Sequence, residues 1–165
     1  MDVLQDFHAI IESEVFKNDG TLEKYIGDAA MAVFGAPVKS PDDADNAVKC
    51  AINWIKAVDK WNILRISEGK EAIKIGIGVD YGPVTGGIIG KTRNMSYAVV
   101  GATVNRASRL ENLTREIDAQ IIISNDLYQA LKNKNIFEEN GFSVSLQKAI
   151  LKGIDEQNIW AIKKA

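Results

Sequence analysis

Histidine and cysteine are nearly absent from the sequence, and this scarcity excludes several kinds of chemistry. The 165 residues include a single histidine, His8, and a single cysteine, Cys50. One cysteine cannot form an internal disulfide, which favours a reducing compartment and therefore a cytoplasmic location. With His8 placed in the first expected helix, the sequence also excludes histidine-based metal sites, structural zinc and Ser-His-Asp catalysis.

Long apolar runs and an excess of either charge are also lacking. The longest stretches without a charged residue, 81–90 and 94–105, are far shorter than the roughly 20 apolar residues of a membrane span. Lys and Arg total 20 against 22 Asp and Glu, a net charge of −2, so no basic surface for nucleic acid is expected. Acidic residues at Asp2 and Asp6 stand where a signal peptide would be basic.

The composition is that of a globular protein with a real core, at 46% hydrophobic and 25% charged residues. No linker, repeat or low-complexity segment divides the chain, so residues 1–165 are expected to form one domain. Apolar residues at helical spacing predict a first helix that ends at 18–20. A strand–turn–strand should follow at 22–34, with Gly27-Asp28 as its type II′ turn and Leu22, Lys24 and Ile26 on one face.

The second helix is predicted to open at Ser40-Pro41-Asp42-Asp43, where Ser40 can cap and Pro41 suits the first helical position. Strands and helices then alternate, which predicts an α+β fold, an α/β sandwich with helices packed on a mostly antiparallel sheet. The further strands are expected at 73–81, 84–89, 97–100, 120–124, 142–146 and 159–162, and the further helices at 103–113 and 125–131.

Polar residues occur at three places where packing alone does not require them. Asp28 at a hairpin tip is free to bind a cation, with Lys24 one strand-length back, although an ordinary Gly-Asp turn would look the same. Asn105 and Arg109 are four apart on one expected helix, on the side away from its apolar residues. That pair could grip a sugar edge and a phosphate, or simply face solvent.

The third place is Lys152, which precedes a glycine near the C-terminus and could approach a phosphate or be an ordinary surface lysine. The glycines between Gly82 and Gly90 match neither a P-loop nor a dinucleotide-binding fingerprint. The three places therefore do not fit the common phosphate-binding motifs.

Together, the segments that carry these residues resemble the class III nucleotidyl cyclase catalytic domain. Residues 20–37, GTLEKYIGDAAMAVFGAP, resemble its hairpin, and residues 97–111, YAVVGATVNRASRLE, resemble its signature helix. The Leu151-Lys152-Gly153 ending falls at the corresponding place, and the resemblance extends from Val3 to Ile162. It implies a ferredoxin-like α+β fold and an adenylate or guanylate cyclase.

In that family two domains pair head to tail, and the ribose 3′-hydroxyl attacks the α-phosphate with the help of two Mg²⁺ or Mn²⁺ ions. By resemblance, Asp28 binds metal, Asn105 orients the ribose and Arg109 meets charge at the α-phosphate. Lys152 contacts the terminal phosphates, and Arg93 makes a second phosphate contact from the other subunit. Lys24 matches a base-selecting position, and its donors suit the N1 acceptor of adenine, so ATP is the expected substrate.

Two departures from the family pattern bear on these roles. The second base-selecting position, usually Asp or Thr, is Ala98, which has no polar side-chain atom. The family's first strand, with its other metal-binding aspartate and a phosphate-binding turn, has no counterpart in this sequence. We therefore expect residues 1–165 alone to show no appreciable cyclase activity, even with Mn²⁺.

Three hypotheses remain open. The first is an adenylate cyclase domain acting in intracellular signalling, as a homodimer regulated by an upstream sensor domain. The second is a degenerate cyclase-homology domain that binds nucleotide or dimerises to regulate a partner, and guanylate cyclase activity is a third alternative.

Overall fold

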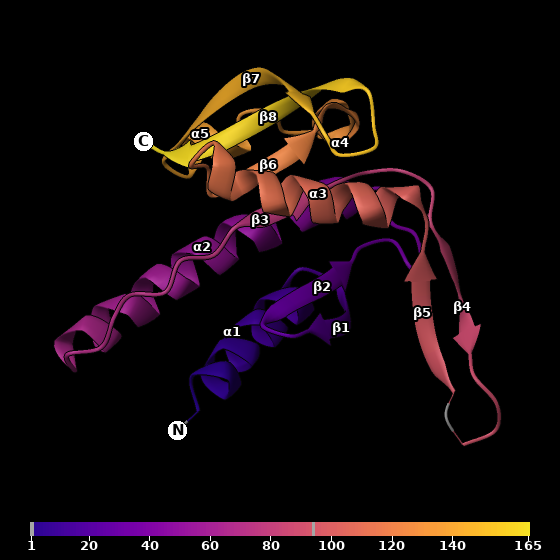
Figure 1. Ribbon diagram of the computed structural model, residues 1–165, viewed down its shortest axis with the longest axis horizontal. Helices are drawn as coiled ribbons and strands as arrows, with labels where there is room; N and C mark the ends of the chain where they lie inside the picture. The colour runs from indigo at the N-terminus through magenta and orange to yellow at the C-terminus, as the bar shows by residue number, and fades with distance from the viewer. Residues whose placement is uncertain (1, 94) are drawn as a thin grey trace.

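Helices pack against a four-stranded sheet, and two β-hairpins form separate small sheets away from it (Figure 1). The computed structural model describes residues 2–93 and 95–165. The first half of the chain forms α1 (Val3–Lys17), β1 (Thr21–Ile26), β2 (Ala29–Val33), α2 (Asp43–Ser67), β3 (Ile77–Val79), β4 (Thr85–Ile89) and β5 (Ser96–Val100). The second half forms α3 (Ala102–Glu116), β6 (Ile121–Ser124), α4 (Asn125–Ala130), α5 (Ile136–Glu139), β7 (Phe142–Ile150) and β8 (Glu156–Lys164).

The four-stranded sheet has the order β3-β6-β8-β7. β3 runs parallel to β6, whereas the other two pairs are antiparallel, so the expected α+β fold with a mostly antiparallel sheet is confirmed. All four residues of β6 are buried, as both faces of this central strand are covered. Ile121 and Ile123 pack with α2 on one face, and Ile122 packs with α3 on the other.

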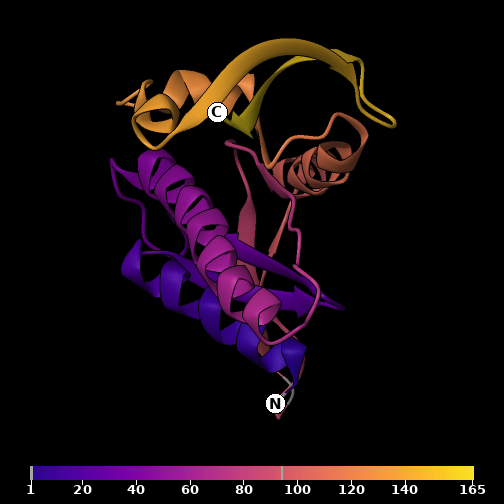
Figure 2. The ribbon, with the colours of Figure 1, turned by 90° about the vertical axis from the view of Figure 1, so that its left-hand side faces the viewer.

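α1 and α2 lie side by side below this sheet (Figure 2). Buried Ile11 and Val15 belong to the apolar stripe that predicted α1, and the side chain of Asn18 closes its end by donating to the Glu14 carbonyl. The indole Nε1 of Trp54 on α2 donates to the carbonyl of Ile11 at 3.2 Å. This bond fixes α2 against α1.

The structure corrects the expected start of the second helix. α2 begins at Asp43, not at Ser40, because the side chains of residues 40–43 form a turn of their own. The backbone amide of Ser40 donates to Asp43 Oδ2 at 2.8 Å, and the amide of Asp42 donates to Ser40 Oγ at 3.2 Å. These bonds hold residues 40–42 outside the helix, where Ser40 does not cap it.

The strand expected at 73–81 is much shorter than predicted, since β3 covers only Ile77–Val79. Asn62 on α2 explains the difference. Its amide donates to the carbonyl of Ile73 and accepts from the amide of Ile73, both at 2.8 Å. One side chain therefore satisfies both backbone groups of Ile73, and no strand pairs there. The single turn α5 was also not expected.

The other elements lie within a few residues of their predicted positions. β7 and β8 are longer than expected, pairing from Phe142–Lys164 to Ile150–Glu156. Over residues 2–93 and 95–165, the structure contains no helix with the length and apolar character needed to cross a bilayer.

Candidate functional site

The β1–β2 hairpin carries two of the predicted site residues. Gly27 and Asp28 form its tip, and the φ of Gly27 is +60°, as the first central residue of a type II′ turn requires. Asp28 is exposed there, free of the core. Lys24 lies near the middle of β1 with 49% of its side chain exposed.

A β-bulge interrupts β1 next to Lys24. The register shifts between Leu22 and Lys24, which face Ala32 and Met31, so Glu23 is an extra residue without a partner on β2. The simple alternation expected for Leu22, Lys24 and Ile26 is therefore wrong. Because a bulge changes the direction of nearby side chains, the carboxylate of Glu23 reaches the ammonium of Lys24 at 3.7 Å.

Glu23 also connects the hairpin to β5. Its Oε1 accepts a hydrogen bond from the backbone amide of Val99 at 3.3 Å. Val99 is buried and directly follows Ala98, the position where the resemblance expects a polar side chain. The structure thus brings Lys24 and the backbone beside Ala98 to the two sides of one buried carboxylate.

Helix α3 carries Asn105 and Arg109 on the side away from the sheet. Leu110 is fully buried, whereas Asn105 is exposed and Arg109 is half-buried, as the helical spacing predicts. The helix lies very close to β3, because a Cβ atom on Gly78 would collide with the backbone of Ala107 and Glu111. Glycine at this position lets the backbone of α3 rest directly on the strand.

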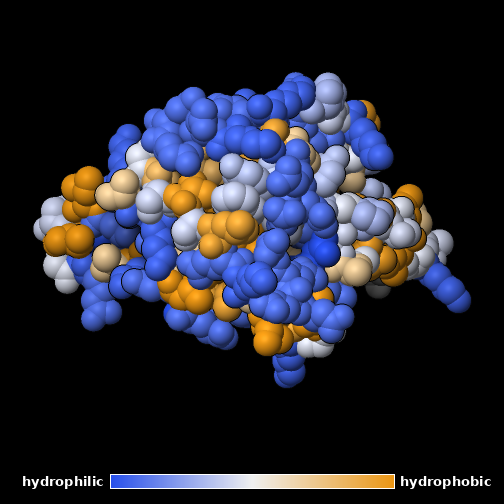
Figure 3. All heavy atoms as spheres, turned by 90° about the horizontal axis from the view of Figure 1, so that it is seen from above, coloured by the Kyte–Doolittle hydropathy of each residue, from blue (hydrophilic) through white to orange (hydrophobic). Residues whose placement is uncertain are grey.

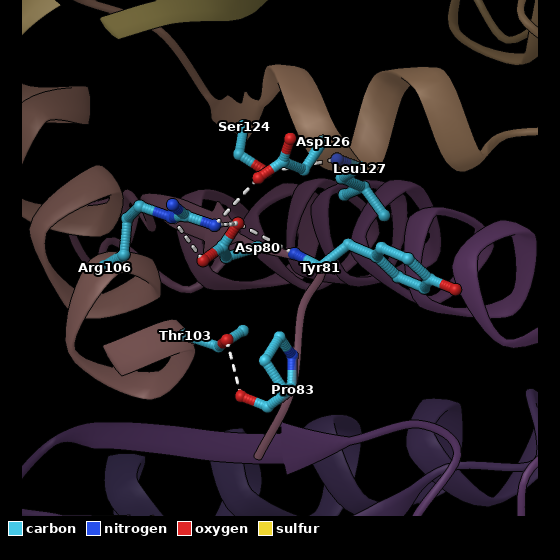
Figure 4. A network of polar contacts seen from close by, with 8 residues as sticks. All are labelled: Asp80, Tyr81, Pro83, Thr103, Arg106, Ser124, Asp126 and Leu127. Carbon is cyan, nitrogen blue, oxygen red and sulfur yellow. Dashed lines mark hydrogen bonds and ion pairs between the residues drawn. The ribbon is translucent and has the colours of Figure 1, made fainter. Parts of the chain in front are cut away.

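The first turns of α3 are tied to the segment after β3 (Figure 4). Arg106 donates from Nε and Nη2 to the two carboxylate oxygens of Asp80 at 2.6 and 3.0 Å, and from Nη2 to Asp126 at 3.1 Å. The side chain of Asp80 is 0% exposed, and its hydrogen bonds raise the pKa of Arg106. The hydroxyl of Thr103 donates to the carbonyl of Pro83 at 2.8 Å. These contacts fix the rotation of α3 and therefore the direction of Asn105 and Arg109.

The turn between β7 and β8 approaches α3 at Arg109. The Nη2 atom of Arg109 lies 3.7 Å from the point that a Cβ on Gly153 would occupy. Gly153 has a φ of +76° and follows the exposed Lys152, so the turn presents both lysine and backbone beside the guanidinium. An open hollow of about 720 Å³ adjoins this turn and is lined by Glu116 and residues 150–155. Arg109 thus lies beside the turn that carries Lys152.

Arg93 lies apart from these groups. It belongs to the turn that joins β4 and β5, a hairpin that projects away from the rest of the chain (Figure 1). Every residue of β4 is exposed. Hydrophobic atoms gather over this hairpin and over the far end of α2, at opposite ends of the long axis (Figure 3). On the hairpin they include Ile88, Ile89, Met95, Tyr97 and Val100.

The single cysteine and the single histidine both pack against other parts of the fold. Cys50 is buried in α2, and burial raises the pKa of its thiol to about 12. His8 on α1 stacks on Tyr25 of β1 with ring centroids 3.6 Å apart. Among the described residues, no cluster of three or more His, Cys, Asp or Glu side chains could hold a metal ion.

Sequence reasoning missed Glu23, Asp80 and Arg106. Glu23 looked like an ordinary strand residue, and the bulge that redirects it follows from the register with β2. Asp80 and Arg106 are 26 positions apart, and their pairing depends on the packing of α3 against β3. Two features of the sequence could have indicated this ion pair. Asp80 lies at the end of an expected strand, and Arg106 lies inside the segment that resembles the family's signature helix.

A family profile described as the adenylate and guanylate cyclase catalytic domain matches residues 1–164. An adenylate cyclase of Anabaena cylindrica is 32% identical over 165 residues, which cover 97% of this chain and 31% of that protein. An uncharacterized protein of Mycobacterium tuberculosis is 34% identical over 148 residues, which cover 88% of this chain and 26% of that protein. The chain thus spans about a third or less of these curated relatives.

Two solved structures are similar over almost the whole chain. The guanylyl cyclase Cya2 superposes with a TM-score of 0.83 at 27% identity, covering 99% of this chain and 79% of that one. The guanylate cyclase domain of RhGC from Catenaria anguillulae, solved with GTP, gives a TM-score of 0.79 at 28% identity, covering 98% of this chain and 81% of that one.

Proposed function

The chain belongs to the family of adenylate and guanylate cyclase catalytic domains, and from that membership we propose that it converts ATP to 3′,5′-cyclic AMP and pyrophosphate. The family includes enzymes for either nucleotide, so the choice of base depends on this chain's own residues. The observation that carries the proposal is the half-exposed ammonium of Lys24 on β1. It offers donors only, which suits the N1 acceptor of adenine, whereas guanine has a donor at N1.

The phosphate-binding part of the proposal rests on the α3 group. Arg109 lies beside the β7–β8 turn, with its Nη2 atom 3.7 Å from the point that a Cβ on Gly153 would occupy, and Lys152 precedes that glycine. Arg109 would stabilise charge that develops on the α-phosphate, and Lys152 would hold the terminal phosphates. Asn105, one turn before Arg109 on the same side, would orient the ribose.

The ribose O3′ forms a bond to the α-phosphorus, and the bond from that phosphorus to the bridging oxygen breaks, so that pyrophosphate leaves. The proton of the 3′-hydroxyl passes to solvent. The Arg106–Asp80 pair ties α3 to the segment after β3, and this supports a role in which the charge of Arg109 would be oriented before the attack.

Divalent metals are general in this family, and the described residues fit them in part. Asp28 offers one exposed carboxylate, and Mg²⁺ is often held by one or two carboxylates together with substrate phosphates. Asp28 would thus hold one Mg²⁺ or Mn²⁺ that arrives with the nucleotide and lowers the charge on its phosphates. The described residues supply no cluster of ligands for a second ion.

The site is proposed to form between two copies of the domain, paired head to tail. Arg93 lies on the projecting β4–β5 hairpin, from which it would reach the phosphates bound by a second copy rather than those bound by its own chain. The exposed apolar side chains of that hairpin would be covered by the same partner. Within a longer cytoplasmic protein, a neighbouring sensor region would then control the pairing.

A cyclase assay tests the proposal. The protein expressed from its whole reading frame is incubated with ATP or GTP and with Mg²⁺ or Mn²⁺, and cyclic AMP and cyclic GMP are quantified. We expect cyclic AMP to dominate, with Lys24→Glu shifting the preference toward GTP. Equal or greater formation of cyclic GMP by the unaltered protein would refute the choice of ATP.

A second candidate is a regulatory module that binds nucleotide or dimerises without catalysis. Two observations favour it: Ala98 offers no polar side-chain atom to the base, and the described residues lack a metal-binding cluster. The same assay separates the two, because a regulatory module would form neither cyclic product.

A further inference from the structure

Glu23 has a buried carboxylate oxygen with no hydrogen-bond partner. Only 3% of its side chain is exposed, and Oε2 accepts no hydrogen bond from residues 2–93 and 95–165, although the ammonium of Lys24 forms a longer ion pair with it. A buried carboxylate oxygen without a hydrogen bond is costly, so such an atom normally accepts one from protein, water or ligand. The position of Oε2 indicates which kind of hydrogen-bond donor it can bind.

The Glu23 carboxylate lies between Lys24 and the backbone beside Ala98, the two positions proposed to select the base. The ammonium of Lys24 is 3.7 Å from Oε2, so donor and acceptor are side by side. The other oxygen, Oε1, accepts from the amide of Val99, which directly follows Ala98. The bulge in β1 produces this arrangement, since regular alternation would direct Glu23 and Lys24 to opposite faces.

We propose that Glu23 is a specificity-determining residue, whose Oε2 accepts a hydrogen bond from the 6-amino group of adenine. This inference rests on the proposed function. Adenine presents one acceptor, N1, directly beside one donor, the 6-amino group. Lys24 supplies a donor and Glu23 an acceptor in the same order, and Glu23 thereby takes the part that a polar side chain at position 98 would play.

The same carboxylate disfavours guanine. Guanine presents two adjacent donors, at N1 and N2, which together need two acceptor oxygens. Only Oε2 is free, because Oε1 is already bound to the amide of Val99. One guanine donor would therefore be buried without a partner, which costs affinity for GTP.

A change of ligand tests the inference on the unaltered protein. Purine riboside 5′-triphosphate is ATP without the 6-amino group. We measure the dissociation constants of ATP, GTP and this analogue by competition against a fluorescent nucleotide, with Mg²⁺ present. ATP should bind about tenfold more tightly than the analogue, the effect of one hydrogen bond to a charged acceptor.

A change of protein tests the same contact from the other side. In Glu23→Gln the single amide oxygen stays with the Val99 amide, so an NH₂ donor replaces the free oxygen. ATP should then bind about tenfold more weakly and no better than the analogue. Adding Ala98→Asp restores an acceptor and the original charge, and should restore the preference for ATP. Glu14 on α1 is another largely buried glutamate, so Glu14→Gln is the matched control. It should leave the dissociation constants of ATP and of the analogue unchanged.

The outcomes separate this inference from the proposed function. If the unaltered protein binds neither ATP nor GTP, the proposed function fails and the inference fails with it. If it binds ATP and the analogue equally, or if Glu23→Gln leaves ATP binding unchanged, only the inference fails and Glu23 merely connects β1 to β5. If Glu23→Gln lowers the melting temperature strongly, the inference is judged from the unaltered protein alone, by comparing its dissociation constants for ATP and for the analogue.

Discussion

The carboxylate of Asp80 accepts two hydrogen bonds from one guanidinium, that of Arg106, at 2.6 and 3.0 Å. Asp80 directly follows β3, and Arg106 lies in the second turn of α3, one residue after Asn105. The pair therefore joins the sheet to the helix that carries the proposed ribose and phosphate contacts. The contribution of this pair to the stability of the fold and the contribution of α3 to turnover can be tested separately.

Removal of the guanidinium should destabilise the fold strongly. Arg106→Leu leaves Asp80 buried without its partner, which should lower the free energy of unfolding by about 3–5 kcal/mol. In Asp80→Leu/Arg106→Leu neither charge remains, so more than half of this loss should be recovered. Urea unfolding measures both. Arg115→Leu, which removes an exposed pair with Glu111, is the control and should cost about 1 kcal/mol or less; an equal cost for Arg106→Leu would contradict the argument.

The exposed face of α3 should matter for turnover and not for stability. Arg109→Ala should lower kcat by about 10²-fold or more, because it removes a preorganised charge at the α-phosphate, and Asn105→Ala should also lower it strongly. Both melting temperatures should stay near that of the unaltered protein, as neither side chain is buried in the core. Asn112→Ala, on the same helix, is the control for turnover. A large drop in melting temperature would show that the two residues are structural.

Pairing of two copies should depend on the β4–β5 hairpin. Ile88 is 71% exposed, and Ile88→Lys should weaken self-association and reduce activity together, since a buried interfacial lysine without a partner is unfavourable. Sedimentation velocity gives the association state. Ile63→Lys is the matched control, because Ile63 is 73% exposed at the other end of the molecule, on α2. Equal effects of the two substitutions would argue against the hairpin as the interface.

The contact between Tyr25 and Glu12 should make stability depend on alkaline pH. Burial, and then the 2.7 Å hydrogen bond to Glu12, raise the pKa of Tyr25 to about 12 from its usual value near 10. The stabilisation is complete below pH 10 and is lost as the pH rises through 12. Urea unfolding between pH 9 and 12 should therefore show a steeper decline for the unaltered protein than for Tyr25→Phe. Parallel curves would mean that Tyr25 titrates alike in the folded and unfolded chain.

Local patterns in the sequence predicted most of the elements. The apolar stripe of α1, the Gly27-Asp28 turn and the exposed face of α3 follow from spacing and turn chemistry, which act over a few residues. The resemblance supplied the family and the roles proposed for the site residues. Those roles remain predictions, whereas the family is confirmed.

Long-range contacts account for what the sequence did not predict. The bulge at Glu23 depends on the register of β1 with β2, and the hydrogen bond from Val99 links residues 76 positions apart. The turn at Ser40 depends on a competition between side-chain and helical hydrogen bonds, which propensity alone cannot decide. These misses thus involve polar side chains that bind backbone groups, across the fold at Glu23 and within the turn itself at Ser40.

The double hydrogen bond between Asn62 and Ile73 has a consequence for local opening of the chain. Because no ladder protects the amide of Ile73, its exchange with deuterium is controlled by one side chain near the exposed end of α2. The amides of β6, bonded within the sheet, exchange only when the sheet itself opens. The segment that leads into β3 can therefore detach together with the last turns of α2 while the centre of the domain stays closed.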